Sequence, residues 1–160
     1  MKYVGIFAVL VAAALCAREY SRIKKKHLYE CRDFLAFVSH LRIQLGCFLR
    51  TPSELAASFS SEALESSGFL GALAEGRDFL GAFDAALPRL SLSGEEAEIL
   101  RTLFSSFSEG YRDELIRVID ATYARFEPIC NALSQECPKS IKLASVLSVT
   151  GALGFLILVI

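Results

Sequence analysis

The chain has 160 residues, which is enough for one ordinary domain and too few for a large multidomain enzyme. Apolar residues make up 53% of it and charged residues 22%, and the mean hydropathy of +0.42 is high for a water-soluble protein. This composition argues against a disordered chain, a collagen-like repeat and a nucleic-acid-binding chain. The net charge of −1 averages over a very uneven distribution along the sequence.

Two uncharged apolar segments lie at the ends of the sequence, residues 3–17 (YVGIFAVLVAAALCA) and residues 143–160 (LASVLSVTGALGFLILVI). At about 1.5 Å per residue, the second spans roughly 27 Å as a helix, close to the hydrocarbon thickness of a bilayer, and the first spans about 22 Å. We therefore expect an N-terminal transmembrane anchor over residues 1–18 and a C-terminal transmembrane helix over residues 143–160. The alternative for the second segment is a helix buried in a protein core.

Basic residues flank both apolar segments on their inner sides. All six lysines lie beside the segments, and seven residues form what we call the basic collar: Arg18, Arg22, Lys24, Lys25, Lys26, Lys139 and Lys142. Basic residues resist translocation, so the side of the membrane that carries them is cytoplasmic. The collar therefore predicts a cytoplasmic helical domain over residues 19–142, with both termini on the other side of the membrane.

The first apolar segment has a second interpretation. Lys2, the apolar run and the small residues near Ala17 resemble a secretory signal peptide. The basic residues that follow the run oppose export and favour an uncleaved anchor. The alternative function is thus an exported helical binding module with a cleaved signal peptide and a C-terminal membrane anchor.

The central residues 27–138 are acidic and poor in strand-forming residues. Nine arginines, no lysines and 17 acidic residues give them a net charge of −8, which opposes binding to the phosphates of DNA or RNA. Only ten of these 112 residues are Val, Ile or Thr, and the good helix formers Ala, Leu, Glu and Arg dominate. We expect an all-α fold, with a helical bundle between the two transmembrane helices.

The first helix is predicted to continue through the collar to about Phe48. Apolar residues recur at steps of three and four along it and predict one buried face: Cys31, Phe34, Val38, Leu41, Leu45 and Phe48. A second helix start follows, because Thr51 can cap, Pro52 suits the first helical position and Glu54 can bond back to the cap. This helix is expected to reach about Ser61.

Short helices are predicted over residues 62–74 and 78–87, the latter ending at Pro88. The glycines in this region leave open whether it packs tightly or forms a loosely ordered linker. Ser93 and Glu96 predict a second capping box, and the helix that they start is expected to break near Gly110.

The last helix is predicted to begin near Tyr111, to bend at Pro128 and to reach a joint with the second apolar segment at Pro138. Its apolar face consists of Leu115, Ile119, Thr122, Phe126, Ile129 and Leu133. The two long helices are expected to form an antiparallel pair, with the short helices at the end far from the membrane.

The sequence holds no recognised catalytic or metal-binding motif. The five cysteines show no C-x-x-C spacing, and His27 and His40 belong to no zinc pattern. We read Glu95, Glu96 and Glu98 as a solvated first helical turn rather than as acid–base residues. We therefore expect a non-enzyme with no catalytic, cofactor-binding or metal-ligating residues and no small-molecule substrate. The competing hypothesis is a membrane-bound hydrolase, for which the two histidines are the available bases.

Two glycines three residues apart, Gly151 and Gly154, lie inside the second apolar segment. Small residues at this spacing let a second membrane helix approach closely, so they are candidate helix-packing residues in the membrane. Ordinary glycine use in a membrane helix is the alternative.

Taken in order, these features resemble the stage III sporulation protein AB family of endospore-forming bacteria, over essentially the whole chain. The stretches that carry the resemblance are residues 45–54 (LGCFLRTPSE), 95–107 (EEAEILRTLFSSF) and 150–160 (TGALGFLILVI).

The resemblance implies an accessory part in a multi-protein complex that joins mother cell and forespore. It implies a soluble region like the helical domains of type II secretion platform proteins, which would scaffold or dock a cytoplasmic secretion-type ATPase. The implied partners are the membrane and other stage III sporulation proteins, with that ATPase among them. The implied location is the mother-cell membrane around the forespore, with two spans and a cytoplasmic centre. No residue for partner binding follows from it.

Overall fold

The computed structural model describes residues 2–47, 51–108 and 112–159, and these contain helices and no strand. In chain order they are α1 (Lys2–Cys47), α2 (Pro52–Ala57), α3 (Glu62–Ser67), α4 (Phe69–Ala74), α5 (Phe79–Ala86), the short 3-10 helix η1 (Leu87–Arg89), α6 (Gly94–Ser106) and α7 (Arg112–Val159). The expected all-α fold is confirmed. Phe48, Gly110 and Tyr111, where three helix boundaries were predicted, lie outside the described residues.

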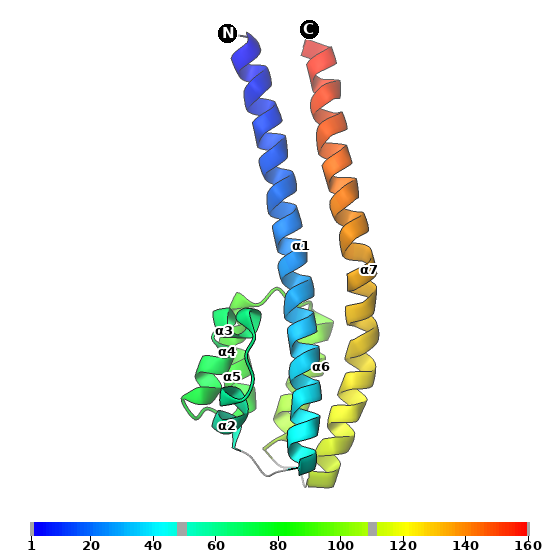
Figure 1. The fold of residues 1–160 in the computed structure, drawn as a ribbon. Coiled ribbons are helices and arrows are strands. Elements are labelled where there is room, and N and C mark those ends of the chain that lie inside the picture. The colour runs from blue at the N-terminus through cyan, green and yellow to red at the C-terminus, as the bar shows by residue number, and fades with distance from the viewer. Residues whose placement is uncertain (1, 48–50, 109–111, 160) are drawn as a thin grey trace.

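Two long helices, α1 and α7, form the frame of the molecule. They run side by side in opposite directions, so that both chain ends lie at the same end of the pair (Figure 1). Side-chain contacts fix their register: Arg42 pairs with Asp120, Arg32 donates to Ser134 Oγ at 3.0 Å, and the Cys130 thiol contacts the carbonyl oxygen of Cys31. The antiparallel pair predicted from the sequence is present.

The short helices lie beside α1, not beyond its end. The helices α2 to α5 form a group along the half of α1 that is far from the chain termini, and α6 packs against α7 (Figure 1). The expectation that they cover the distal end of the pair is therefore wrong. The reason is that the apolar face of α1 is wider than one partner helix can cover, so the short helices complete its burial.

The capping signals predicted from the sequence locate α2 and α6 correctly, and the structure adds a cap at α5. Thr51 and Glu54 form a capping box at α2, Ser93 and Glu96 form another at α6, and Asp78 caps α5. The single helix expected over residues 62–74 is divided in two at Gly68. Gly68 has a φ of +85°, a left-handed conformation that ends α3 and lets α4 start in a new direction.

The helix α7 passes through Pro128 and Pro138 without a break. The joint predicted at Pro138 is thus absent. Each proline removes one backbone hydrogen bond, but Phe126, Cys130 and Cys137 are buried on either side of the prolines and keep α7 continuous.

Phenylalanine rings fill the centre of the core. Phe69 of α4 contacts Phe34 and Phe37 of α1, Phe83 of α5 and Phe104 of α6, with ring centroids 5.4–6.5 Å apart. All five rings are fully buried. The described residues of both predicted apolar faces are buried, except that Ile129 and Leu133 of α7 are partly exposed. The region of short helices, residues 62–87, is therefore packed into the core and is not a loosely ordered linker.

Within the part of the chain that the structure describes, no helix combines the length and the apolar character needed to cross a membrane.

Replacing Phe69 with Ala should lower the free energy of unfolding by about 3–5 kcal/mol, because it removes the ring that links four helices and leaves a cavity. Chemical unfolding of the full chain followed by circular dichroism measures this loss. The control is Ile43→Ala at a side chain that is 61% exposed, which should change stability by less than about 0.5 kcal/mol. Equal losses in both variants would contradict the assigned core.

Candidate functional site

Polar side chains, of which Glu30 and Glu96 are buried, gather on one stretch of α1, where the loop before α6 crosses it. Lys26, His27 and Glu30 of α1 meet the loop after η1 and the first turn of α6, which carries Glu96. We call these four residues the polar clamp. Among the described residues, no buried side-chain nitrogen or oxygen lacks a hydrogen-bond partner, so the clamp is fully satisfied.

Glu30 and Lys26 hold the loop. The backbone N–H of Ser91 donates to Glu30 Oε2 at 2.6 Å, and the Lys26 ammonium pairs with the other oxygen of Glu30 at 3.5 Å. Lys26 also donates to the carbonyl oxygen of Arg89 at 2.9 Å. The Glu30 side chain is only 2% exposed, so these partners replace the hydrogen bonds that water would make to it.

Glu96 and His27 join α6 to α1. Glu96 Oε2 lies 2.7 Å from His27 Nε2 and accepts the Ser93 backbone N–H at 2.6 Å. Burial by itself raises the pKa of the Glu96 carboxyl. The hydrogen bond and charge of His27, with the Ser93 bonds, outweigh burial and hold that pKa below its ordinary value. Glu96 is therefore an ionised carboxylate in a buried position.

Two cysteines lie next to this pair. Cys31 is one helical turn after His27 on α1, and the Cys130 thiol of α7 donates to its carbonyl oxygen at 3.4 Å. Both are buried. A hydrogen bond with Cys130, burial and the charge of Glu96 raise the pKa of the Cys31 thiol. Cys31 therefore stays protonated in the absence of a cation.

The cluster matches the residue types of a thiol–histidine–carboxylate triad, but its physics opposes that chemistry. A catalytic cysteine needs a lowered pKa and access to substrate, and Cys31 has a raised pKa and no exposed surface. The residues do suit a cation. One ligand atom each from His27, Cys31 and Glu96 lies within 4.8 Å of the other two.

The structure corrects the sequence-based interpretation of Glu96. It was expected to be solvated with its two neighbours, but its side chain is only 3% exposed, while Glu95 and Glu98 are exposed as expected. The cause is the capping box, which turns the residue at this position back toward the helix start, here onto α1. One residue of the basic collar, Lys26, is part of the polar clamp, where it contacts Glu30 and the carbonyl oxygen of Arg89.

Other predicted site residues lie outside the cluster. His40 lies 2.9 Å from Ser58 Oγ and beside Phe59, so the two histidines do not form one site. Arg22 pairs with Glu19, and Lys24 lies 5.8 Å from the centre of the Tyr20 ring. The structure does not bring these groups together into a reactive constellation.

The two glycines of the second apolar segment are exposed on α7. A Cβ added at Gly151 or Gly154 would stand in open space, so neither glycine mediates the packing of α7 against α1. Their surface is available to another helix.

The sequence contained one signal for the cluster that the motif search missed. His27 and Cys31 are four residues apart, which places both side chains on the same face of a helix. Glu96 was recognised only as a capping residue. No spacing rule connects it with α1, because 69 residues separate Glu96 from His27.

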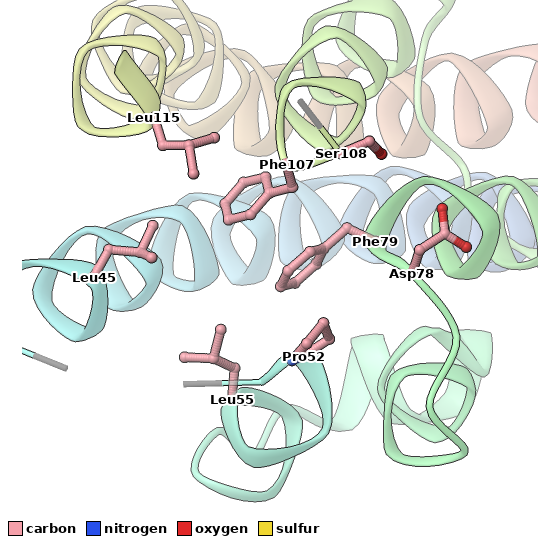
Figure 2. Close-up of a pocket in the computed structure, with 8 residues that line it drawn as sticks. All are labelled: Leu45, Pro52, Leu55, Asp78, Phe79, Phe107, Ser108 and Leu115. Carbon is pink, nitrogen blue, oxygen red and sulfur yellow. The ribbon is translucent and has the colours of Figure 1, made fainter. Parts of the chain in front are cut away.

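A separate apolar pocket of about 270 Å³ lies at the distal end of the pair. It is lined by Leu45, Pro52, Leu55, Asp78, Phe79, Phe107, Ser108 and Leu115 (Figure 2). Its one ionisable lining residue, Asp78, already accepts the backbone N–H of Gly81 as the cap of α5. The pocket therefore offers apolar contact without a group placed for chemistry.

Comparison with known proteins identifies one family. Residues 2–160 match the family model described as Stage III sporulation protein AB. Comparison with curated proteins and with solved structures yields no significant match.

Replacing Glu96 with Gln should lower the free energy of unfolding near pH 7 by about 1 kcal/mol, because neutral hydrogen bonds replace charge-assisted ones. The Glu96 pKa is lower in the folded state, so its stabilisation is present above the unfolded pKa and lost as pH falls through the folded pKa. The difference between wild type and variant should therefore shrink below about pH 4.3. Denaturant unfolding at several pH values measures it.

The matched control is Glu95→Gln, on the exposed neighbour of Glu96. This variant should differ from wild type by less than about 0.5 kcal/mol. If the difference in free energy of unfolding between wild type and Glu96→Gln stays constant with pH, the ionised form of Glu96 does not stabilise the fold.

Proposed function

The chain belongs to the stage III sporulation protein AB family, and on this basis we propose that it is a non-enzymatic, membrane-anchored component of the transenvelope complex between mother cell and forespore. In this proposal two helical ends hold it in the mother-cell membrane around the forespore. Its central domain, in the cytoplasm, scaffolds or docks a secretion-type ATPase. Other stage III sporulation proteins are its partners.

The observation that carries the proposal is the position of the two uncharged segments. Both extend from the same end of the α1–α7 pair, beyond the short helices (Figure 1). Their described large side chains are 40–62% exposed: Val11, Leu15, Leu143, Val146, Leu147 and Val149. Apolar surface of this extent, gathered at one end, favours contact with lipid or with other apolar helices.

The basic collar supports the same orientation. The contacts Arg42–Asp120 and Arg32–Ser134 set the register of α1 and α7. Extended toward the chain ends, this register puts Lys24 and Lys25 of α1 at about the level of Lys139 and Lys142 of α7. A ring of positive charge at one level, just inside two apolar ends, suits the anionic lipid headgroups of a cytoplasmic leaflet.

The acidic central domain supports docking of a protein partner. Its charge of −8 over residues 27–138 is repelled by anionic lipid and attracts a basic surface. Glu62 and Glu65 of α3 and Glu75, just after α4, are exposed. The helices α3 and α4 lie on the side of α1 away from α7 (Figure 1). We propose this face for the partner, because it is farthest from the α1–α7 seam.

The alternative function, an exported helical module, depends on cleavage of the first apolar segment. The basic residues that follow the first apolar segment oppose export and favour the uncleaved form, in which α1 is one helix from Lys2 to Cys47. The mature N-terminus distinguishes the two: Met1 supports the anchor, and a start near Ala17 or Arg18 supports export.

The topology can be tested by cysteine labelling in intact cells. A cysteine introduced by Glu75→Cys, in a background lacking native cysteines, should react with a membrane-impermeant maleimide only after the cytoplasmic side is opened. Replacing Lys24, Lys25, Lys139 and Lys142 with Glu should reduce that protection, because the positive charge that keeps the central domain in the cytoplasm is lost. Labelling of Glu75→Cys from outside intact cells would contradict the proposed cytoplasmic location.

The docking can be tested by co-purification of the full chain with the secretion-type ATPase of the same organism. Capture should be strong at low salt and fall several-fold at about 0.5 M salt, since exposed charges are screened. The variant Glu62→Gln, Glu65→Gln, Glu75→Gln should weaken capture at low salt. The control is Asp113→Asn with Glu114→Gln, which removes two exposed charges at the start of α7. No capture of the ATPase at low salt would remove the docking role.

A further inference from the structure

Zinc-ligand residue types converge where α1, α6 and α7 meet. His27, Cys31 and Glu96 each present one ligand atom within 4.8 Å of the others, and the Cys130 thiol of α7 lies beside them, 3.4 Å from the backbone carbonyl oxygen of Cys31. From this juxtaposition we propose that His27, Cys31 and Glu96, with Cys130 as the fourth ligand, form a structural zinc site. The proposal is independent of the function proposed above.

The donor set selects the metal. Zinc is held in proteins by histidine nitrogen, cysteine sulfur and carboxylate oxygen, most often four in number. Magnesium and calcium require oxygen ligands, and this cluster offers only one carboxylate. Four donors from three helices make a closed structural site, with no position left for substrate.

The charges balance in the buried site. The Glu96 carboxylate and one thiolate neutralise Zn²⁺ while His27 binds in its neutral form. The second thiolate leaves an excess of one negative charge. Arg32, next to Cys31 in the chain, acts electrostatically in favour of a Cys130 thiolate and offsets that excess. On binding, the two thiols lose their protons to solvent and two Zn–S bonds form, so zinc affinity should rise with pH.

The ligands are already supported by their surroundings. His27 and Cys31 lie one turn apart on the same face of α1, as two ligands on a helix must. The Ser93 N–H orients the Glu96 carboxylate through a 2.6 Å hydrogen bond, which is the kind of outer contact that fixes metal ligands. This support comes from the capping box of α6 and from the helix geometry of α1.

The adjustment needed for binding is small. Zinc–ligand bonds of 2.0–2.3 Å place neighbouring ligand atoms about 3.3–3.8 Å apart in a tetrahedron. His27 Nε2 and Glu96 Oε2, now in a hydrogen bond of 2.7 Å, must separate by about 0.6–1 Å. Separations near the 4.8 Å limit must close by about 1–1.5 Å. We expect side-chain rotations to supply these changes, with the Cys130 thiol turning from the Cys31 carbonyl oxygen toward the metal.

The experiment uses the full-length protein, purified, stripped of metal with a chelator and titrated with Zn²⁺ or Co²⁺. We expect equimolar zinc binding by elemental analysis and, with Co²⁺, the thiolate charge-transfer absorption of a tetrahedral site. Cys31→Ser and Glu96→Gln should each weaken zinc binding at least about tenfold. Glu96→Gln is the decisive variant, because Gln can still accept from Ser93 and bond to His27, so the fold is retained.

The controls are Cys16→Ser and Glu95→Gln, at an exposed thiol and an exposed carboxylate. Both should bind zinc as wild type does. Zinc should also raise the thermal stability of the wild type and of both controls, and should raise that of Glu96→Gln less at the same zinc concentration. Absence of equimolar zinc, or zinc binding that Glu96→Gln leaves intact, would overturn the proposal and leave the cluster as a hydrogen-bonded clamp alone.

Discussion

The antiparallel seam between α1 and α7 is the constraint on which the rest of the structure depends. These two helices contain more than half of the described chain, and their register is fixed by contacts at several levels, from Arg42–Asp120 to Cys31–Cys130. A slip by one residue along a helix would rotate the buried face by about 100° and expose it. Because the register is fixed, the two apolar ends stay adjacent, and the basic residues on the inner side of each stay level.

The short helices depend on this seam and in turn complete it. The α1 surface left uncovered by α7 is filled by aromatic rings, with Phe69 contacting rings from three other helices. The polar clamp then fixes the position of α6 by burying Glu30 and Glu96 with matched donors. Apolar packing supplies most of the stabilisation here. The clamp selects one position of α6, because a buried carboxylate is stable only where hydrogen-bond donors surround it.

This division of roles relates the fold to the function proposed for it. The end that carries the apolar surface contains the chain termini, and the acidic side helices lie at the other half of the molecule (Figure 1). The antiparallel pair of helices therefore links an apolar end with an acidic face, which is the arrangement that the proposed scaffold requires. A scaffold needs such a link, and it needs no reactive group.

The sequence by itself determined the helical class, the paired long helices, the buried faces and the starts of α2 and α6. Each depends on residues within a few positions of one another: the repeat from Phe34 to Leu41, and the capping boxes at Thr51 and Ser93. Only the tertiary structure decided that the short helices lie beside α1, that α7 continues through Pro138, and that Glu96 meets His27 and Cys31. These features depend on packing between segments far apart in the chain. Local periodicity contains no information about which distant face a side chain will meet, so the candidate site became visible only once three helices were brought together.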